Sequence, residues 1–125
     1  MHLKLNQPDK AAITCTMALE FHIIANDPLN QGHDHYELGN VYLAQEELDR
    51  AEMSYMNALK LHKPVNSTWG QGNDFYGLGR VYMQRQELEK AKGMFEKAIS
   101  FHSKAQDRMA EQKDQEYLSK VLAQM

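Results

Sequence analysis

The sequence has little of what several classes of protein require. It contains one cysteine, one tryptophan and three prolines, and no run of the roughly 20 apolar residues that a membrane span needs. One cysteine cannot form an internal disulfide, so we expect a reducing compartment, by default the cytoplasm, with the nucleus left open. The first ten residues, MHLKLNQPDK, lack the apolar core of a secretory signal. These absences argue against a membrane protein and against a secreted one.

Basic charge is also scarce. The formal net charge is −3, with 14 lysines and arginines against 17 aspartates and glutamates. No basic field is available to hold a phosphate backbone, so we expect no nucleic-acid partner. Phosphate-binding loops, paired-cysteine metal sites and nucleophile elbows are missing from the sequence. We therefore predict a protein that is not an enzyme and that has neither a cofactor nor a metal site.

What the sequence does contain is a 40-residue repeat. Residues 31–62 read QGHDHYELGNVYLAQEELDRAEMSYMNALKLH, residues 71–102 read QGNDFYGLGRVYMQRQELEKAKGMFEKAISFH, and 13 of these 32 aligned pairs are identical. Such a period is typical of stacked repeats, in which each unit buries its apolar face against its neighbours. We predict one domain over residues 1–125, with both ends cut inside a unit. It divides into a half repeat (1–26), two full repeats (27–66 and 67–106) and another half repeat (107–125).

The spacing of apolar residues predicts two helices in each unit. The first helix carries His35, Leu38, Gly39 and Tyr42 on one face, and the second carries Leu48, Ala51, Tyr55 and Ala58. Alternating strand patterns are absent, so the fold class is all-α. Asp27, Ser67 and Asp107 recur at one point of the period and are good N-cap residues. The predicted first helices span about 28–44, 68–84 and 108–124, and the second helices about 8–24, 47–62 and 87–104.

This repeat resembles the tetratricopeptide repeat. The residues that carry the resemblance are Leu38-Gly39, Tyr42, Ala51, Tyr55 and Ala58, and again Leu78-Gly79, Tyr82, Ala91, Phe95 and Ala98. The usual unit of that family has 34 residues, whereas this one has 40. The resemblance implies a right-handed superhelical solenoid of antiparallel helix pairs. It also implies a non-catalytic module that binds a peptide or a partner helix on its concave face.

The resemblance is incomplete at both ends and in one ligand set. Cys15 replaces the family aromatic residue, and Ser119 replaces the family glycine. One subclass of the family clamps the acidic C-terminal tails of heat-shock chaperones with lysine, arginine and asparagine side chains. Here tyrosines, Tyr36 and Tyr117, occupy two of the basic positions of that clamp. An incomplete cluster cannot hold two carboxylates well, so we do not expect the clamp.

A stripe beside the core face of the first helices is the predicted partner-binding surface. Tyrosine, methionine and arginine are residue types that are enriched at interfaces. Leu29, Trp69 and Met109 either extend this stripe or pack on the end of a neighbouring helix. The predicted concave-face residues are Tyr36, Asn40, Leu43, Tyr76, Arg80, Met83, Glu116 and Lys120.

Two alternatives remain open for the function. Uncapped apolar faces at the ends of the chain predict self-association or a homo-oligomer, with the candidate residues Leu3, Cys15, Leu118, Val121 and Leu122. A superhelical groove could also enclose a small ligand, which would make the chain a sensor domain.

The recurring histidines resemble metal ligands in the sequence, but their positions argue against a metal site. His22, His62 and His102 recur every 40 residues, and neighbouring helix axes lie about 8–10 Å apart, too far for one zinc ion. We interpret them as helix-end residues favoured by the helix dipole. His33 and His35 point about 200° apart on a helix, so we expect His35 in the core and His33 in solvent. Cys15 reads as a small buried hydrophobic residue.

Overall fold

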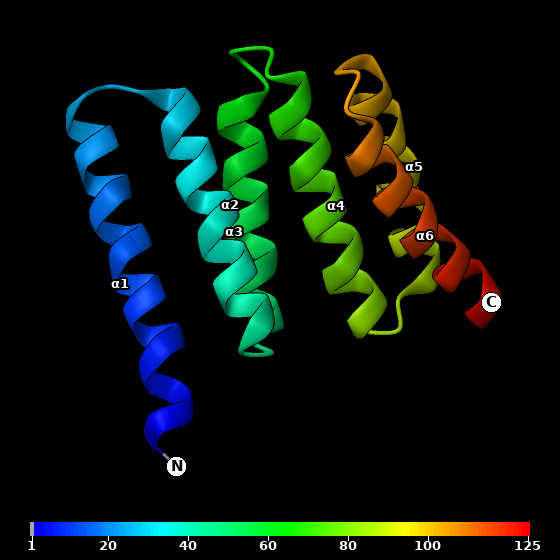
Figure 1. The fold of residues 1–125 in the computed structure, drawn as a ribbon, viewed down its shortest axis with the longest axis horizontal. Coiled ribbons are helices and arrows are strands. Elements are labelled where there is room, and N and C mark those ends of the chain that lie inside the picture. The colour runs from blue at the N-terminus through cyan, green and yellow to red at the C-terminus, as the bar shows by residue number, and fades with distance from the viewer. Residues whose placement is uncertain (1) are drawn as a thin grey trace.

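A computed structural model describes the backbone of residues 2–125 and the side chains of residues 10–125. The six helices are α1 (His2–Ile24), α2 (Pro28–Ala44), α3 (Leu48–His62), α4 (Thr68–Gln84), α5 (Leu88–Lys104) and α6 (Arg108–Gln124). They form a row of antiparallel pairs in two layers, with α3 and α5 behind the others in Figure 1. No strand occurs in this described part, and the predicted all-α solenoid of helix pairs is confirmed.

Side-chain caps explain why α2, α4 and α6 begin at the predicted residues. The Asp27 carboxylate accepts a hydrogen bond from the Asn30 amide at 3.2 Å, and Ser67 Oγ accepts one from the Gly70 amide at 3.0 Å. Asp107 does the same for the Ala110 amide at 3.1 Å. Each bond satisfies an amide that has no partner inside the helix. The one large error lies in α1, which begins at His2 and not near Pro8.

All five turns between the helices share one backbone conformation. Each contains one residue in the left-handed region, with φ between 55° and 64°: Asn26, Glu46, Asn66, Gln86 and Gln106. In each turn the next residue's amide donates to a carbonyl five residues back, as Glu47 N does to Tyr42 O at 2.9 Å. This is the Schellman arrangement, which satisfies the last carbonyls of a helix. The chain therefore reverses direction every 20 residues by the same turn.

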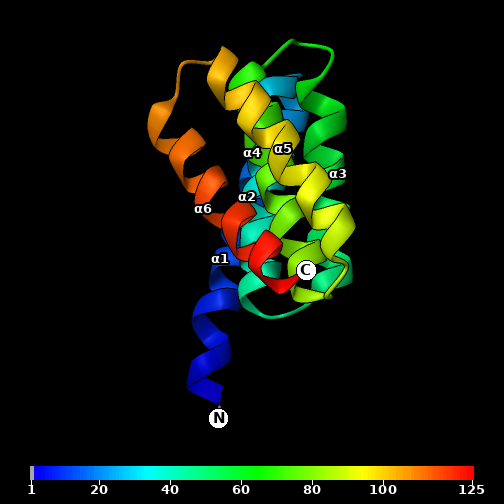
Figure 2. The ribbon, with the colours of Figure 1, turned by 90° about the vertical axis from the view of Figure 1, so that its right-hand side faces the viewer.

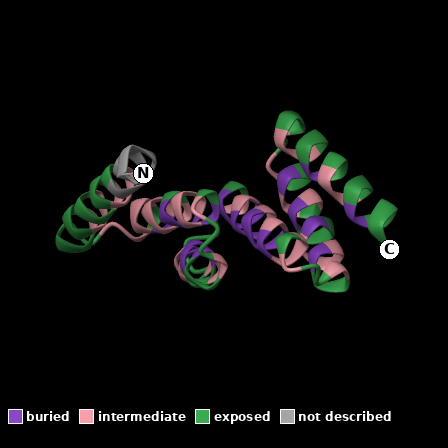
Figure 3. Ribbon diagram, turned by 90° about the horizontal axis from the view of Figure 1, so that it is seen from below, coloured by how far each residue is buried: buried purple, intermediate pink, exposed green. Residues whose placement is uncertain are grey.

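The core forms where aromatic rings of α3 and α5 pack against glycines of α2 and α4. A Cβ atom on Gly39 or Gly77 would lie 2.6 or 2.4 Å from the Tyr55 ring, and one on Gly79 would lie 2.7 Å from the Phe95 ring. Tyr55 and Phe95 are both fully buried. The glycines thus make room for rings, which fix the distance between the helices. Most buried residues lie on α2 to α5, in the middle of the row (Figure 3).

The row of helices is curved because its two layers pack differently. Helix α2 contacts α4, and α4 contacts α6, whereas α3 and α5 do not contact each other within the described residues. Figure 2 looks along the row and shows α6 on one side, with α3 and α5 on the other. Helices α2, α4 and α6 therefore form the inner, concave face. None of the helices in residues 2–125 combines the length and apolarity of a membrane span.

Candidate functional site

Arg80 of α4 is the centre of a polar network on the concave face. Its Nη2 donates to Asn40 Oδ1 on α2 at 2.8 Å and to the Tyr55 hydroxyl at 3.2 Å. The Tyr55 hydroxyl in turn donates to Asn40 Oδ1 at 2.6 Å. The guanidinium carbon lies 4.4 Å from the centre of the Tyr76 ring, so the cation is also stacked on an aromatic face. Three helices thereby hold one arginine side chain in place.

The partners of Arg80 are neutral. Burial raises the pKa of Tyr55 and of Tyr76 above the ordinary value of 10.0, although Arg80 opposes the shift, so both phenols keep their protons near neutral pH. No carboxylate forms an ion pair with Arg80 among residues 10–125, and its Nε atom is buried there without a hydrogen-bond partner. A partly buried cation without a counter-charge is costly for a fold to keep. The arrangement can therefore receive an anion.

Aromatic rings continue the surface from α4 to α6. The Tyr76 ring meets the Tyr117 ring edge to face, with centroids 5.4 Å apart, and Tyr117 stacks on Phe95 at 5.5 Å. The Lys120 Nζ atom lies 4.9 Å from the centre of the Tyr117 ring. The row Asn40–Arg80–Tyr76–Tyr117–Lys120 therefore crosses all three inner helices without a break.

Two depressions lie along this concave face. The first, of about 320 Å³, is formed by the C-terminal halves of α2 and α4 with Tyr117. Its lining residues are Asn40, Leu43, Ala44, Arg80, Met83, Gln84 and Tyr117. The second, of about 540 Å³, lies toward the N-terminal ends of α2, α4 and α6. Its lining residues are His33, Tyr36, Glu37, Trp69, Asn73, Asp107, Met109, Ala110 and Lys113.

Trp69 and Met109 give the second depression an apolar wall that solvent reaches. Trp69 is 44% exposed and Met109 is 83% exposed. The indole Nε1 donates to the Asp107 carboxylate at 3.1 Å, which holds the orientation of the ring. Sequence reasoning left open whether these residues pack on neighbouring helix ends. Both remain accessible.

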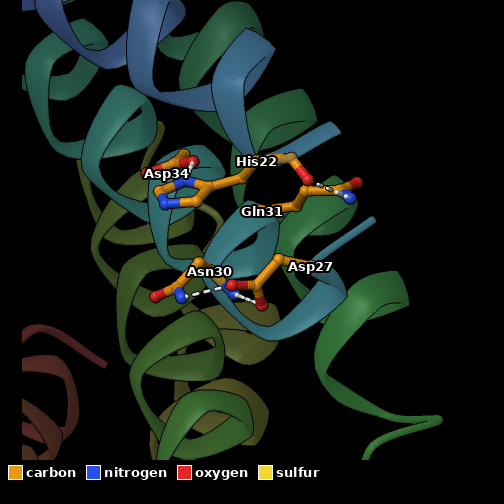
Figure 4. Close-up of polar contacts among 5 residues, drawn as sticks. All are labelled: His22, Asp27, Asn30, Gln31 and Asp34. Carbon is orange, nitrogen blue, oxygen red and sulfur yellow. Dashed lines mark hydrogen bonds and ion pairs between the residues drawn. The ribbon is translucent and has the colours of Figure 1, made fainter. Parts of the chain in front are cut away.

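A histidine–aspartate pair joins each second helix to the helix that follows it. The Nδ1 atoms of His22, His62 and His102 lie 2.5, 2.6 and 2.5 Å from Oδ2 of Asp34, Asp74 and Asp114. Figure 4 shows the first pair, with the Gln31 amide reaching the His22 carbonyl at 3.2 Å. Sequence analysis placed these histidines at helix ends but missed their partners. The signal was present, because the aspartates recur with the same 40-residue period.

The surroundings of the three pairs differ. His22 and Asp34 have side chains 22% and 13% exposed, whereas those of His62 and Asp74 are 1% and 0% exposed. Burial raises the pKa of Asp74 to about 6, and the hydrogen bond from His62 opposes that shift. The glycines Gly32 and Gly72 make room for the rings of His62 and His102, since a Cβ atom there would lie 2.5 or 2.6 Å from them. The His62–Asp74 and His102–Asp114 pairs are therefore buried in the core, whereas the His22–Asp34 pair is partly exposed.

Comparison with known families decides the identity of the repeat. A sequence model described as tetratricopeptide repeat matches residues 35–63 and 75–101, which cover most of α2–α3 and of α4–α5. The chain belongs to the tetratricopeptide-repeat family. Tetratricopeptide repeats generally mediate protein–protein interaction or scaffolding, and the family is typically non-catalytic. A search of curated proteins found no match to this chain.

Several predicted binding residues of this tetratricopeptide-repeat chain lie together, and others do not. Tyr36 lines the second depression, while Asn40, Arg80 and Met83 line the first. Leu43 touches the first depression but is only 6% exposed, because it packs in the core with Tyr55 and Val81. Glu116 is exposed on α6 and lines neither depression.

The predicted self-association residues also lie in different environments. Val121 is fully buried against Ala91 and Phe95, which corrects its assignment to an exposed end face. Leu118 packs against the same cluster, Leu122 is exposed, and Cys15 is partly buried. Leu3 lies outside the residues whose side chains are described.

The prediction that His33 lies in solvent is also corrected. Its ring lies 5.2 Å from the His62 ring and 5.2 Å from the Trp69 ring. Burial there lowers the pKa of His33 below its ordinary value. The helical wheel put His33 away from the core of its own helix pair, but it could not show that α4 covers this side of α2.

Proposed function

We propose that this chain is a protein-interaction module that binds a peptide or a partner helix on the concave face of α2, α4 and α6. The observation that carries the proposal is the continuous row of polar and aromatic side chains around Arg80. Its cation has only neutral partners, and two depressions of about 320 and 540 Å³ flank it. Arginine, tyrosine, tryptophan and methionine are the residues on which interface energy concentrates.

Site-specific photo-crosslinking tests the face that is used. A photoreactive amino acid replaces Lys113 or Lys120 on the concave side, or Lys60 or Glu96 on α3 and α5, all of which are exposed. We expect adducts with the same protein from extract of the native cells at the first two positions only. Equal adducts from both pairs of positions would contradict the concave face.

A triple substitution tests the residues. Tyr36→Ala, Tyr76→Ala and Arg80→Gln together remove the aromatic platform and the cation, so we expect loss of binding to the partner that the crosslinks identify. Circular dichroism and the unfolding temperature show whether the variant is folded. A folded triple variant that binds the partner as the wild type does would refute the assignment of these residues.

The outer face of α1 supports self-association as a second candidate function. Ile13, Met17, Phe21 and Ile24 fall within about 80° of one another on the helix, and their exposed fractions run from 58% to 86%. Such a contiguous apolar stripe is costly to leave in water. We expect sedimentation at several concentrations to detect association that Phe21→Glu abolishes. A wild-type chain that remains monomeric throughout the range would eliminate this candidate.

A further inference from the structure

We propose that the concave face recognises an extended acidic segment of a partner protein. One side-chain carboxylate of that segment binds Arg80, and one apolar side chain enters the depression beside Trp69 and Met109. This inference rests on the proposed function and specifies the chemistry of its partner.

The state of Arg80 supports a carboxylate as the first contact. Its Nη2 is used by Asn40 and Tyr55, and stacking on Tyr76 fixes the plane of the guanidinium. Nη1 makes no hydrogen bond or ion pair with any side chain in residues 10–125, and Arg80 itself lines the 320 Å³ depression. A carboxylate matches the planar donor geometry of arginine and forms a charge-assisted bond with it. It also supplies the counter-charge that the neutral neighbours lack.

The charge near Arg80 favours the same assignment. Lys120 lies on the Tyr117 ring, and Tyr117 lines the same depression as Arg80. Neither Lys120 nor Arg80 forms an ion pair among the described side chains. An acidic segment therefore meets two cations at this end of the concave face.

The other end of the face selects a different side chain. Trp69, Met109 and Tyr36 give the 540 Å³ depression its apolar walls, and its lining also includes Glu37, Asp107 and Lys113. A second carboxylate there would be repelled by these two acids, whereas a leucine, methionine or phenylalanine would bury apolar surface. The two ends are therefore not interchangeable, and the segment binds in one direction.

The helix geometry sets the spacing between the two contacts. Asn73 lies seven residues before Arg80 on α4 and Trp69 lies eleven before it. At 1.5 Å per residue these separations are roughly 10 and 16 Å along the axis. An extended chain rises about 3.3 Å per residue, so the acidic and apolar residues lie about three to five positions apart.

The proposed contact differs from capture of a chain terminus. It needs one side-chain carboxylate and no free C-terminus, because a single guanidinium, that of Arg80, receives it. An internal segment of a partner therefore satisfies it.

Peptide selection on the full chain tests this inference. Random decapeptides are displayed with their C-termini fused to a coat protein, so that no free carboxylate ends the peptide. We expect the enriched sequences to share an aspartate or glutamate three to five positions from a large apolar residue. Replacing the acid by its amide should weaken binding of a selected peptide to the wild-type chain by about tenfold or more.

A double-substitution cycle identifies Arg80 as the receptor. In Arg80→Gln, the same change in the peptide should have no further effect, whereas in Arg50→Gln it should keep its full effect. Arg50 is a suitable control because it is an exposed arginine that also stacks on a tyrosine ring, at 5.7 Å. The peptide substitution on the wild-type chain stays informative even if Arg80→Gln proves unstable.

These experiments distinguish failure of this inference from failure of the proposed function. Enriched peptides that crosslink to the concave face without any preference for an acid would overturn this inference and leave the proposed function standing. An acid whose effect persists in a folded Arg80→Gln would also overturn it. If no peptide is enriched, both the inference and the peptide-binding function are refuted.

Discussion

Gly79 and Gly93 are both inside helices, yet the space around them differs. A Cβ atom at Gly79 would lie 2.7 Å from the Phe95 ring, and that ring is held by the stacked Tyr117 ring. A Cβ atom at Gly93 would meet nothing within 4 Å. The first glycine is therefore required by packing, and the second is not.

Alanine substitutions should separate these two cases. Both gain about 1 kcal/mol of helix propensity. Gly79→Ala also overpacks the core by about 1–3 kcal/mol, so we expect a net loss of stability. Gly93→Ala should be stabilised by about 1 kcal/mol. Urea unfolding measures both, and a Gly79→Ala variant as stable as Gly93→Ala would show that the ring can move.

Cys15 gives a second prediction at this scale. Burial, with smaller contributions from Glu37 and Asp34, raises the pKa of its thiol above the ordinary value of 9.0. Because the thiolate is the reactive form, alkylation by iodoacetamide should be slow at pH 8 and should have its midpoint above pH 9. The same cysteine in the urea-unfolded chain is the control. A midpoint below that of the unfolded chain would contradict the burial of Cys15.

At the scale of the elements, one histidine–aspartate pair connects α1 to α2, another connects α3 to α4, and the third connects α5 to α6. All three have the same geometry, and they differ chiefly in exposure. Breaking a buried pair leaves one charged or polar group without its partner, whereas water can replace the partner in an exposed pair. The exposure of a pair should therefore determine how much breaking that pair destabilises the fold.

Substituting the aspartates tests this dependence. Asp74→Ala should cost about 3–5 kcal/mol, the range for breaking a buried pair. Asp34→Ala should cost clearly less, since His22 is 22% exposed. Asp74→Asn keeps an acceptor for His62 and should recover part of the loss. Urea unfolding of the three variants gives the order, and equal losses for Asp34→Ala and Asp74→Ala would rule out exposure as the cause.

The helices were easier to predict than the contacts between them. Asp27, Ser67 and Asp107 marked the starts of α2, α4 and α6 because an N-cap acts within four residues. The partner of His62 could not be found by the same local rules, since Asp74 lies beyond a turn. The network around Arg80 was missed for a related reason. Tyr55 was assigned to the core, and helical spacing does not show that its hydroxyl reaches Asn40.

The whole molecule has a graded rather than a uniform core. Helix α4 is covered by α3 and α5 and also touches α2 and α6, while α1 contacts α2 alone among the described residues. In repeat proteins, stability is roughly a sum of each unit and its contacts with neighbours. The centre of the chain should therefore open less often than either end.

Hydrogen exchange with peptide-level mass spectrometry can measure this gradient. We expect the slowest exchange in peptides from α4 and α5 and the fastest in those from α1 and α6. Asp34→Ala should speed exchange in α1 without changing α5. Uniform protection over the whole chain would mean that the six helices unfold as one unit.

The five turns, each with one residue of left-handed backbone conformation, limit how this chain can change in length. They recur every 20 residues, whereas the contacts of Gly39 with Tyr55 and of Gly79 with Phe95 recur every 40. Losing 20 residues would preserve every turn but would set ring-bearing helices against one another in place of glycine-bearing ones. A change of 40 residues keeps both periods in register. Insertions and deletions in the array should therefore preserve the packing only when they comprise whole 40-residue units.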